Sequence, residues 1–383
     1  MPELAVRFNE LPTQDDHRIG VATLNAPASL NALSLEMIEQ LAERLEAWEG
    51  DPQVVAVWLE GAGGKAFCAG GDIVALYRSI TAGGDDMSEA RAFAEAYFSA
   101  EYALDYRIHT YSKPLLVWAD GIVMGGGMGL MAGAGYRLVT ESSRLAMPEI
   151  SIGLYPDIGA SWFLSRMPPG VGAYLGLTGA QLNARDALDL GLADRLIPRE
   201  RHADLQQALA DADYGRGLPS DAHRAVSRVL DEVEVREQAP SAQLWPYLDH
   251  LQALTAGTDV ADACRRILDD SRDESWLAAN RARLAAGCPL SAHLVWRMLE
   301  RHRHGSLVET FREELSLSVR CCTEGDLAEG VRALLIDKDK QPHWSHVDVE
   351  SVPAGDVTAL LAPLWPADSH PLRGLGNKDG SYP

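Results

Sequence analysis

Positive charge is scarce in this sequence. Its 383 residues include 34 Lys plus Arg against 55 Asp plus Glu, which gives a net charge of −21 with His neutral. Such an acidic balance opposes the phosphate backbone, so we expect no nucleic-acid partner. A small anionic ligand is still compatible with it, because a local pocket lined by amides can oppose the global charge.

Paired cysteines, a membrane-length apolar run and a leader peptide are also missing. The five cysteines form no CxxC pair, which is typical of reduced intracellular thiols. The most apolar stretch, Pro114–Val139, contains Asp120 and Arg137, so it predicts buried elements and no membrane span. Met1–Pro12 lacks the basic and apolar regions of a targeting signal. We therefore expect a cytoplasmic protein.

Several common catalytic signatures are absent. No GxSxG sequence occurs, which argues against a serine hydrolase of the strand-turn-helix type. Gly61–Lys65 has some likeness to a phosphate-binding loop, but its spacing is wrong and Ala66 follows the lysine. The histidines at 302, 304, 343 and 346 have no carboxylate or Cys partner at ligand spacing, so we expect no metal site.

Strand and helix patterns alternate in the first half of the chain. Val54–Leu59 is a β-branched run typical of a buried strand, and the apolar residues after Ser34 recur at helical spacing. Further strands are predicted at Gly20–Leu24, Leu115–Trp118, Arg137–Thr140 and Leu145–Met147, with loops at Gly61–Asp72 and Pro148–Gly159. This alternation predicts an α/β fold with a mostly parallel sheet.

After Ile197 the strand patterns give way to helical periodicity. Helices are predicted at Ala203–Ala212, Ala222–Gln238, Val260–Leu268, Leu277–Ala286, Ser291–Arg303 and Leu307–Val319. The stretch from Val347 onwards is rich in Pro, Gly and Asp. We therefore predict a core at residues 1–200, a helical region at 201–346 and a tail at 347–383.

Two glycine-rich loops, 61–72 and 121–129, each follow a predicted strand. Glycines at such a junction let a ligand approach the backbone, where free N–H groups attract negative charge. If both loops lie at the same end of the sheet, one amide from each could bind a single carbonyl oxygen as an oxyanion hole. The alternative is that the glycines only allow tight packing of helix against strand.

Two carboxylates lie eight residues apart, each directly after a proline: Glu149 in Met-Pro-Glu and Asp157 in Tyr-Pro-Asp. The prolines hold each acid in a fixed backbone frame. A carboxyl group in a partly apolar setting has a raised pKa and can act as a base or nucleophile. Alternatively, Glu149 is an acid in the first turn of a helix and Asp157 is a capping residue.

These segments together resemble the crotonase (enoyl-CoA hydratase/isomerase) superfamily. The matching motifs are Gly63-Gly-Lys-Ala-Phe-Cys-Ala-Gly-Gly-Asp72, Gly121-x3-Gly-Gly-Gly127, Leu30-Asn-Ala-Leu33, Leu177-Thr-Gly179 and Glu329-Gly-Val-Arg-Ala-Leu-Leu-Ile-Asp-Lys-Asp339. The segment from Met147 to Gly159 resembles the 3-hydroxyisobutyryl-CoA hydrolase branch. The likeness runs from about residue 18 to Trp344 and implies the crotonase (ClpP/crotonase-like) α/β fold: a spiral of ββα units with a helical C-terminal region.

The resemblance also implies roles for individual residues. The amides that hold a thioester oxygen match Gly71 and Gly126, and the active-site acids match Glu149 and Asp157. Glu101 matches a further acid that contacts the substrate. The implied substrate is an acyl-CoA, with CoA as part of the substrate and no separate cofactor. Ala28 departs from the pattern, because many relatives carry a basic residue there, near the CoA phosphates.

Two positions distinguish this chain from typical hydratases. Typical hydratases carry a second glutamate two residues after the triple glycine, where this chain has Gly129, and they have glycine at the position of Asp157. The resemblance therefore favours thioester hydrolysis, most simply of 3-hydroxyisobutyryl-CoA in valine breakdown. The alternatives are an enoyl-CoA hydratase or isomerase with Glu149 as lone proton shuttle, and a non-catalytic binding protein. Homo-oligomer formation is left open.

Overall fold

The computed structural model describes residues 4–84 and 86–376, which separate into two compact units. The first unit comprises residues up to Gly71, Arg107–Leu145 and Leu182–Trp245, and the second comprises Asp72–Tyr106, Ala146–Gln181 and the chain from Pro246. The boundaries predicted at residues 200 and 346 stay predictions. Residues 377–383 of the predicted tail lie outside the described residues.

Two sheets form the frame of the first unit. The larger has the order β1-β2-β3-β5-β7-β10 and the smaller β4-β6-β8-β9. The strands of the larger sheet are β1 (Val6–Pro12), β2 (Arg18–Leu24), β3 (Val54–Gly61), β5 (Leu115–Ala119), β7 (Tyr136–Val139) and β10 (Arg195–Leu196). Those of the smaller sheet are β4 (Ala66–Cys68), β6 (Ile122–Met124), β8 (Arg144–Ala146) and β9 (Leu182–Asn183). All pairs of the larger sheet are parallel except β1 with β2.

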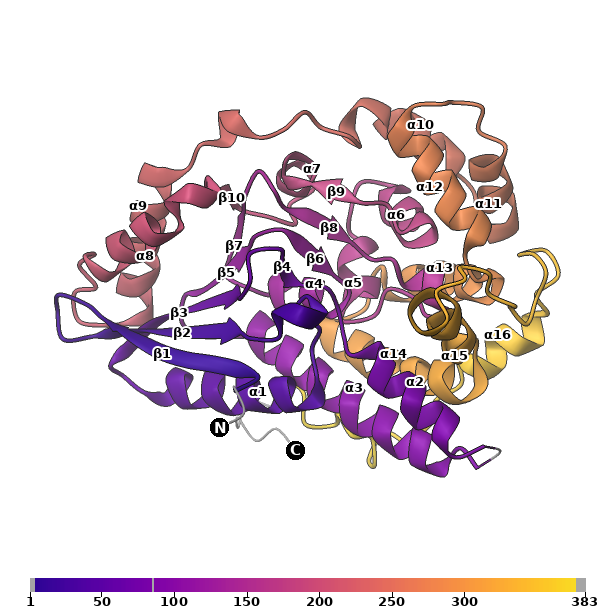
Figure 1. Cartoon of the computed structure of the whole chain (residues 1–383), viewed down its shortest axis with the longest axis horizontal. Coiled ribbons are helices and arrows are strands. Elements are labelled where there is room, and N and C mark those ends of the chain that lie inside the picture. The colour runs from indigo at the N-terminus through magenta and orange to yellow at the C-terminus, as the bar shows by residue number, and fades with distance from the viewer. Residues whose placement is uncertain (1–3, 85, 377–383) are drawn as a thin grey trace. The chain divides into compact units, whose positions relative to one another are not determined.

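Helices cover both faces of the larger sheet (Figure 1). Those of the first unit are α1 (Leu35–Gly50), α4 (Gly126–Ala132), α7 (Ala184–Asp189), α8 (His202–Ala210) and α9 (Pro219–Val233). Because side chains alternate along a strand, β2 has two different faces. A Cβ at Gly20 would lie 2.6 Å from the Trp48 ring of α1. Ile19 and Val21 point to the other face, where they share a core with Leu205 of α8 and Val226 of α9.

The short strand β4 lies inside the segment that the sequence predicts as a loop. That prediction is wrong for Ala66–Cys68, because these residues are buried and pair in parallel with β6. A Cβ at Gly127, in the first turn of α4, would lie 2.3 Å from the carbonyl oxygen of Cys68. The glycine therefore allows α4 to approach β4 closely.

The second unit is built mainly from helices. They are α2 (Ile73–Ala82), α3 (Ser88–His109, as far as Tyr106), α5 (Ala160–Leu164), α6 (Val171–Thr178), α10 (Leu248–Leu254), α11 (Val260–Leu268), α12 (Ser275–Ala286), α13 (Pro289–His302), α14 (Leu307–Glu324), α15 (Leu327–Val331) and α16 (Ala354–Leu360). A π-helix at Arg332–Ile336 follows α15. Phe311 of α14 contacts Tyr102 and Tyr106 of α3, which joins the two long helices.

Two other predicted irregular segments contain helix. The loop predicted at Pro148–Gly159 begins with a 3₁₀ helix at Glu149–Ile152, so the prediction is wrong there. Its turn is stabilised because Cys288 donates its backbone N–H to the carbonyl of Ile150 at 2.9 Å. The tail carries α16, whose Val357 and Leu360 are buried. In the described ranges, no helix combines the length and apolar character needed to cross a membrane.

The contact between α4 and β4 predicts the effect of a single methyl group. Gly127→Ala places a Cβ against the Cys68 carbonyl, so the strand or the helix must shift. Overpacking of this kind costs about 1–3 kcal/mol, which we expect as a lower midpoint of urea unfolding. Gly50→Ala is the control, since a Cβ at Gly50 meets nothing within 4 Å. Equal midpoints for the two variants would contradict the close approach.

Candidate active site

The two glycine loops lie against each other within the first unit. Strands β4 and β6 are parallel, so the residues that follow them emerge at the same edge. A Cβ built on Gly70 would lie 3.5 Å from the Met124 carbonyl oxygen and 4.0 Å from the Gly126 nitrogen. Gly70 also has a φ of +117°, which L side chains rarely adopt. The predicted oxyanion loops are therefore neighbours.

Each loop offers a backbone amide. Gly126 is the first residue of α4, so its N–H points out of the helix without an intrahelical acceptor. Among the described residues, neither this N–H nor that of Gly71 donates to a backbone carbonyl. Two adjacent free amides can bind one oxygen that carries negative charge. Their role in catalysis stays a prediction.

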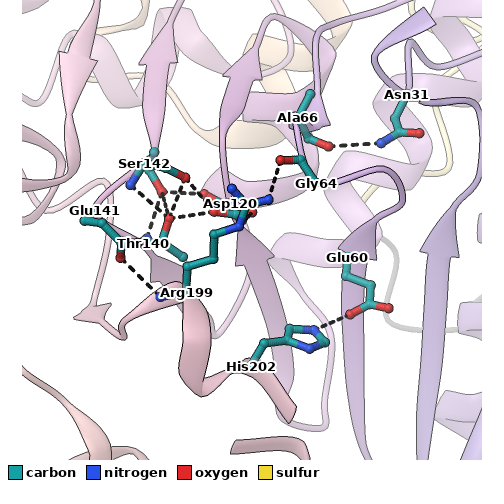
Figure 2. Close-up of polar contacts among 12 residues, drawn as sticks. Asn31, Glu60, Gly64, Ala66, Asp120, Thr140, Glu141, Ser142, Arg199 and His202 are labelled. Carbon is teal, nitrogen blue, oxygen red and sulfur yellow. Dashed lines mark hydrogen bonds and ion pairs between the residues drawn. The ribbon is translucent and has the colours of Figure 1, made fainter. Parts of the chain in front are cut away.

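Asn31 fixes the first loop in place. Its side chain is fully buried and donates to the carbonyl of Ala62 at 2.9 Å. It also donates to the carbonyl of Ala66 at 3.0 Å (Figure 2). Its side-chain oxygen accepts the backbone N–H of Ala26 at 3.0 Å. This one amide thus joins the segment from Ala26 to Asn31 with both ends of the Ala62–Ala66 stretch, which explains why the Leu30–Leu33 motif contains an asparagine. The sequence indicated the motif but not this role.

Arg199 contacts the same loop and the Asp120 cluster (Figure 2). Its guanidinium donates to the carbonyl of Gly64 and forms a 3.1 Å ion pair with Asp120. Asp120 also accepts the hydroxyls of Thr140 at 2.7 Å and Ser142 at 2.6 Å. No motif near Arg199 predicted this contact.

In the second unit, Glu149 is the first residue of the 3₁₀ helix and its side chain is buried. The helix ends at Gly153, whose φ is +73°. Close approaches hold this segment: a Cβ at Gly153 would lie 2.6 Å from the Asp326 backbone, and one at Gly330 would lie 2.4 Å from that of Ile152. Glu149 is thus a first-turn acid, as one alternative proposed, and it is also buried on a rigid segment.

Asp157 begins a tight turn before α5. Ile158 and Gly159 follow with φ angles of 55° and 81°, and a left-handed β-branched residue is strained. The carboxylate of Glu314, on α14, accepts the backbone N–H of Gly159 at 2.7 Å and that of Ser161 at 3.1 Å. Glu314 therefore holds the turn that positions Asp157, and Asp157 does not cap α5, where Gly159 is the N-cap.

A chain of buried hydroxyls reaches Asp157. Tyr102, on α3, donates to the Asp157 carboxylate at 2.5 Å, and its hydroxyl lies 2.7 Å from that of Ser318. The Ser318 hydroxyl lies 3.0 Å from that of Tyr155, which donates to the carbonyl of Glu314. Tyr102, Ser318 and Glu314 were not predicted.

Burial raises the pKa of every carboxyl group in this cluster. The pKa values of Glu101 and Glu149 lie well above 4.5, first because of desolvation and then because of the nearby Asp157 charge. Desolvation raises the pKa of Asp157 to about 6, although the hydrogen bond from Tyr102 lowers it. The pKa of Glu314 is raised to about 8, by desolvation and then by Asp157.

Two of these acids keep an oxygen for a ligand. Oε2 of Glu149 and Oε1 of Glu101 are buried and have no hydrogen-bond partner among the described residues. A buried acceptor without a partner is costly unless a substrate or water binds to it. The structure therefore brings Glu101, Glu149 and Asp157 together in the second unit, and Gly71 and Gly126 together in the first. In the described part of the chain, no group of three His, Cys, Asp or Glu side chains could hold a metal ion.

Comparison with known proteins identifies the family. The sequence model of the family described as "Enoyl-CoA hydratase/isomerase" matches residues 19–361. The chain belongs to this family. The match covers the glycine loops, the acid segment and the helices that follow, so the predicted superfamily is confirmed.

Some relatives in this family are named hydrolases, and others are named hydratases or dehydratases. A curated relative from Xenopus laevis, "3-hydroxyisobutyryl-CoA hydrolase, mitochondrial", is 36% identical over 91% of this chain and 88% of its own. A solved "enoyl-CoA hydratase from Rhodobacter sphaeroides 2.4.1" has 34% identity and a TM-score of 0.81, covering 94% of this chain and 98% of its own. A "Carnitinyl-CoA dehydratase from Mycobacterium thermoresistibile" has 33% identity and the same TM-score, covering 95% and 98%. The solved relatives confirm the predicted crotonase-type α/β fold.

The Tyr102 hydrogen bond predicts a shift in the titration of Asp157. Because Tyr102→Phe removes the donor that favours the carboxylate, the pKa of Asp157 should rise above about 6. Asp157 favours the folded state below its unfolded pKa of 3.8, and this contribution is lost as the pH rises through about 6. In Tyr102→Phe the loss should extend to higher pH. Carboxyl-carbon NMR of the Asp157 side chain measures the pKa directly.

Tyr155→Phe is the matched control for this prediction. It removes a buried hydroxyl from Ser318 and not from Asp157, so the pKa of Asp157 should stay near its original value. An unchanged Asp157 titration in Tyr102→Phe would mean that the short hydrogen bond does not stabilise the carboxylate.

Proposed function

We propose that this chain hydrolyses acyl-CoA thioesters and that 3-hydroxyisobutyryl-CoA is its preferred substrate. The observation that carries the proposal is the buried Glu149 carboxyl, one oxygen of which has no partner among the described residues, in the same unit as Asp157 and Glu101. The curated relatives named 3-hydroxyisobutyryl-CoA hydrolase, which match about nine-tenths of the chain, support the same activity.

In the proposed reaction, the amides of Gly71 and Gly126 hold the thioester oxygen as it gains negative charge. An oxygen from water bonds to the carbonyl carbon, the bond between carbon and sulfur breaks, and the thiolate leaves with a proton as free CoA. Removal of one such amide donor typically costs about 2.7–4 kcal/mol in the barrier. The neighbouring positions of Gly70 and Gly126 support this role for the loops.

Glu149 has two routes to this product. Its carboxylate attacks the carbonyl to form an anhydride that water then hydrolyses, or it takes a proton from the attacking water. Its raised pKa supports either route, since a more basic carboxylate accepts a proton more readily. Asp157, held by Tyr102, would orient Glu149, the water or the substrate hydroxyl. Glu101 would contact the substrate through its free oxygen.

The rival activity is hydration or isomerisation of an enoyl-CoA, which the name of the solved Rhodobacter sphaeroides relative favours. Against it stands Gly129 in α4, since a hydratase of the usual kind needs a glutamate at that position. The two activities differ in product: hydrolysis releases CoA thiol, whereas hydration removes the enoyl absorbance without thiol. A protein that only binds acyl-CoA would produce neither change.

The remaining expectations belong to the same proposal. The reaction needs no cofactor beyond the CoA of its substrate and no metal. A cytoplasmic location and the oligomeric state are tested by cell fractionation and by sedimentation, respectively.

Glu149→Gln tests the assigned catalytic acid. The amide keeps the volume but cannot act as base or nucleophile, so thiol release from 3-hydroxyisobutyryl-CoA should fall by at least about 10²-fold, while binding of the ester is retained. Thiol release and crotonyl-CoA absorbance are followed in parallel. The control is Glu237→Gln, the same substitution at an exposed residue.

Near-normal turnover of Glu149→Gln would remove Glu149 from the mechanism. Rapid hydration of crotonyl-CoA by the unmodified protein, without thiol release, would instead favour the hydratase.

Asp157→Asn tests whether Asp157 recognises the substrate hydroxyl. The substitution removes the charge and weakens a charge-assisted hydrogen bond. We therefore expect a larger loss of kcat/KM for 3-hydroxyisobutyryl-CoA than for isobutyryl-CoA, which lacks the hydroxyl. Equal losses would assign Asp157 to Glu149 or to water, and no loss on either ester would leave it a structural residue of the turn.

A further inference from the structure

Asp105 is a buried acid to which neither the motifs nor the proposed reaction gives a role. It lies on α3, has an exposed fraction of 0%, and neither of its carboxyl oxygens has a hydrogen-bond partner among the described residues. A carboxyl group in that position must keep its proton, because an unpaired buried charge is far more costly than a neutral acid.

Glu101 lies four residues before Asp105 on the same helix. Residues at this spacing share one face of an α-helix and lie one turn apart. Glu101 is also buried, and its Oε1 is without a partner among the described residues. A protonated acid has one O–H to donate, and an ionised acid can only accept, so Asp105 can donate to one oxygen of Glu101 while the other oxygen stays free.

Among the described residues, the groups that shift the pKa values of this pair are all acids, and none is a cation. The pKa of Asp105 is raised well above 3.8 by desolvation first and then by Glu101, Asp157 and Glu314. That of Glu101 is raised by desolvation and then by Asp157. The titratable groups of the cluster come from α3, the 3₁₀ helix, the turn before α5 and α14: Glu101, Tyr102, Asp105, Glu149, Tyr155, Asp157, Glu314, Cys321 and Cys322.

We propose that Asp105 is a positioning residue for Glu101: the two buried carboxyls share one proton across a turn of α3, with Asp105 as donor. The hydrogen bond fixes which Glu101 oxygen is free and keeps that oxygen an acceptor. This role deepens the proposed function, on which it rests, because it makes Glu101 an acceptor for a donor on the substrate, such as a hydroxyl group. Asp105 itself does not touch the substrate.

Two substitutions of Asp105 distinguish the loss of its acidic proton from the loss of its hydrogen-bond donor. In Asp105→Asn the amide still donates to Glu101, but it is a weaker donor than a carboxylic acid and stabilises the Glu101 carboxylate less. Thiol release should be retained, with the acidic limb of its pH profile shifted to higher pH. Asp105→Leu removes the donor, so kcat/KM for the hydroxylated ester should fall by at least about 10-fold. Glu89→Gln, at an exposed position in the first turn of α3, is the control and should change neither property.

The same substitutions in a Glu101→Gln background show whether Asp105 acts through Glu101. If it does, Asp105→Leu should cause little further loss there, because the two effects are not additive. A full further loss in that background, together with an unshifted pH profile for Asp105→Asn, would overturn the proposal and leave Asp105 a packing residue.

Infrared spectroscopy tests the shared proton without any turnover. The stretching band of a protonated carboxylic acid should persist in the unmodified protein at pH 8 and should lose the contribution of one group in Asp105→Asn. Identical bands in the two proteins would refute the proton sharing. If no CoA ester releases thiol, the proposed function fails, while the infrared result still decides whether Asp105 holds the proton.

Discussion

A carboxylate removed from water is costly unless it is hydrogen-bonded or protonated, and the helical unit buries several around one turn. Glu314 receives two backbone N–H groups and Asp157 receives a tyrosine hydroxyl. Glu101, Asp105 and Glu149 retain oxygens without partners among the described residues. The packing of α3 on α14, through Phe311, keeps this group dry. Desolvation then makes the acids stronger bases than they are in water, which is the property that thioester chemistry requires.

The regular elements with clear periodicity could be predicted from the sequence. The apolar residues after Ser34 form α1, of which Ser34 is the N-cap, and the strand at Val54–Leu59 forms most of β3. Elements without a periodic signal were not found. Strand β1 is an edge strand with mostly exposed residues whose apolar–polar alternation covers only Val6–Asn9, and α6 is buried almost all around, so neither shows the sustained periodicity on which prediction depends. Strand β4 has only three residues, too few to show a period.

Only the parts of the site that have a local sequence pattern were predicted. Glycines after strands and acids after prolines are visible in short windows, and these gave the loops and the acid pair. Asn31, Tyr102 and Glu314 act on residues that are 31 to 155 positions away in the chain, so no local pattern reveals their partners. The spacing of Glu101 and Asp105 on an otherwise apolar helix face was one local signal that could have been used.

The strained turn at Ile158 links motion in the site to protonation. A left-handed β-branched residue costs about 1–3 kcal/mol, and the Glu314 carboxylate offsets that cost by holding the amides of Gly159 and Ser161. Burial raises the pKa of Glu314 to about 8, so its ionised form is less favourable in the closed turn than in an opened turn that water reaches, and the turn should open locally more often above that pH than below it. The two amide protons would then exchange with solvent at a rate set by the charge on one side chain, so the frequency with which Asp157 leaves its position is itself a function of pH.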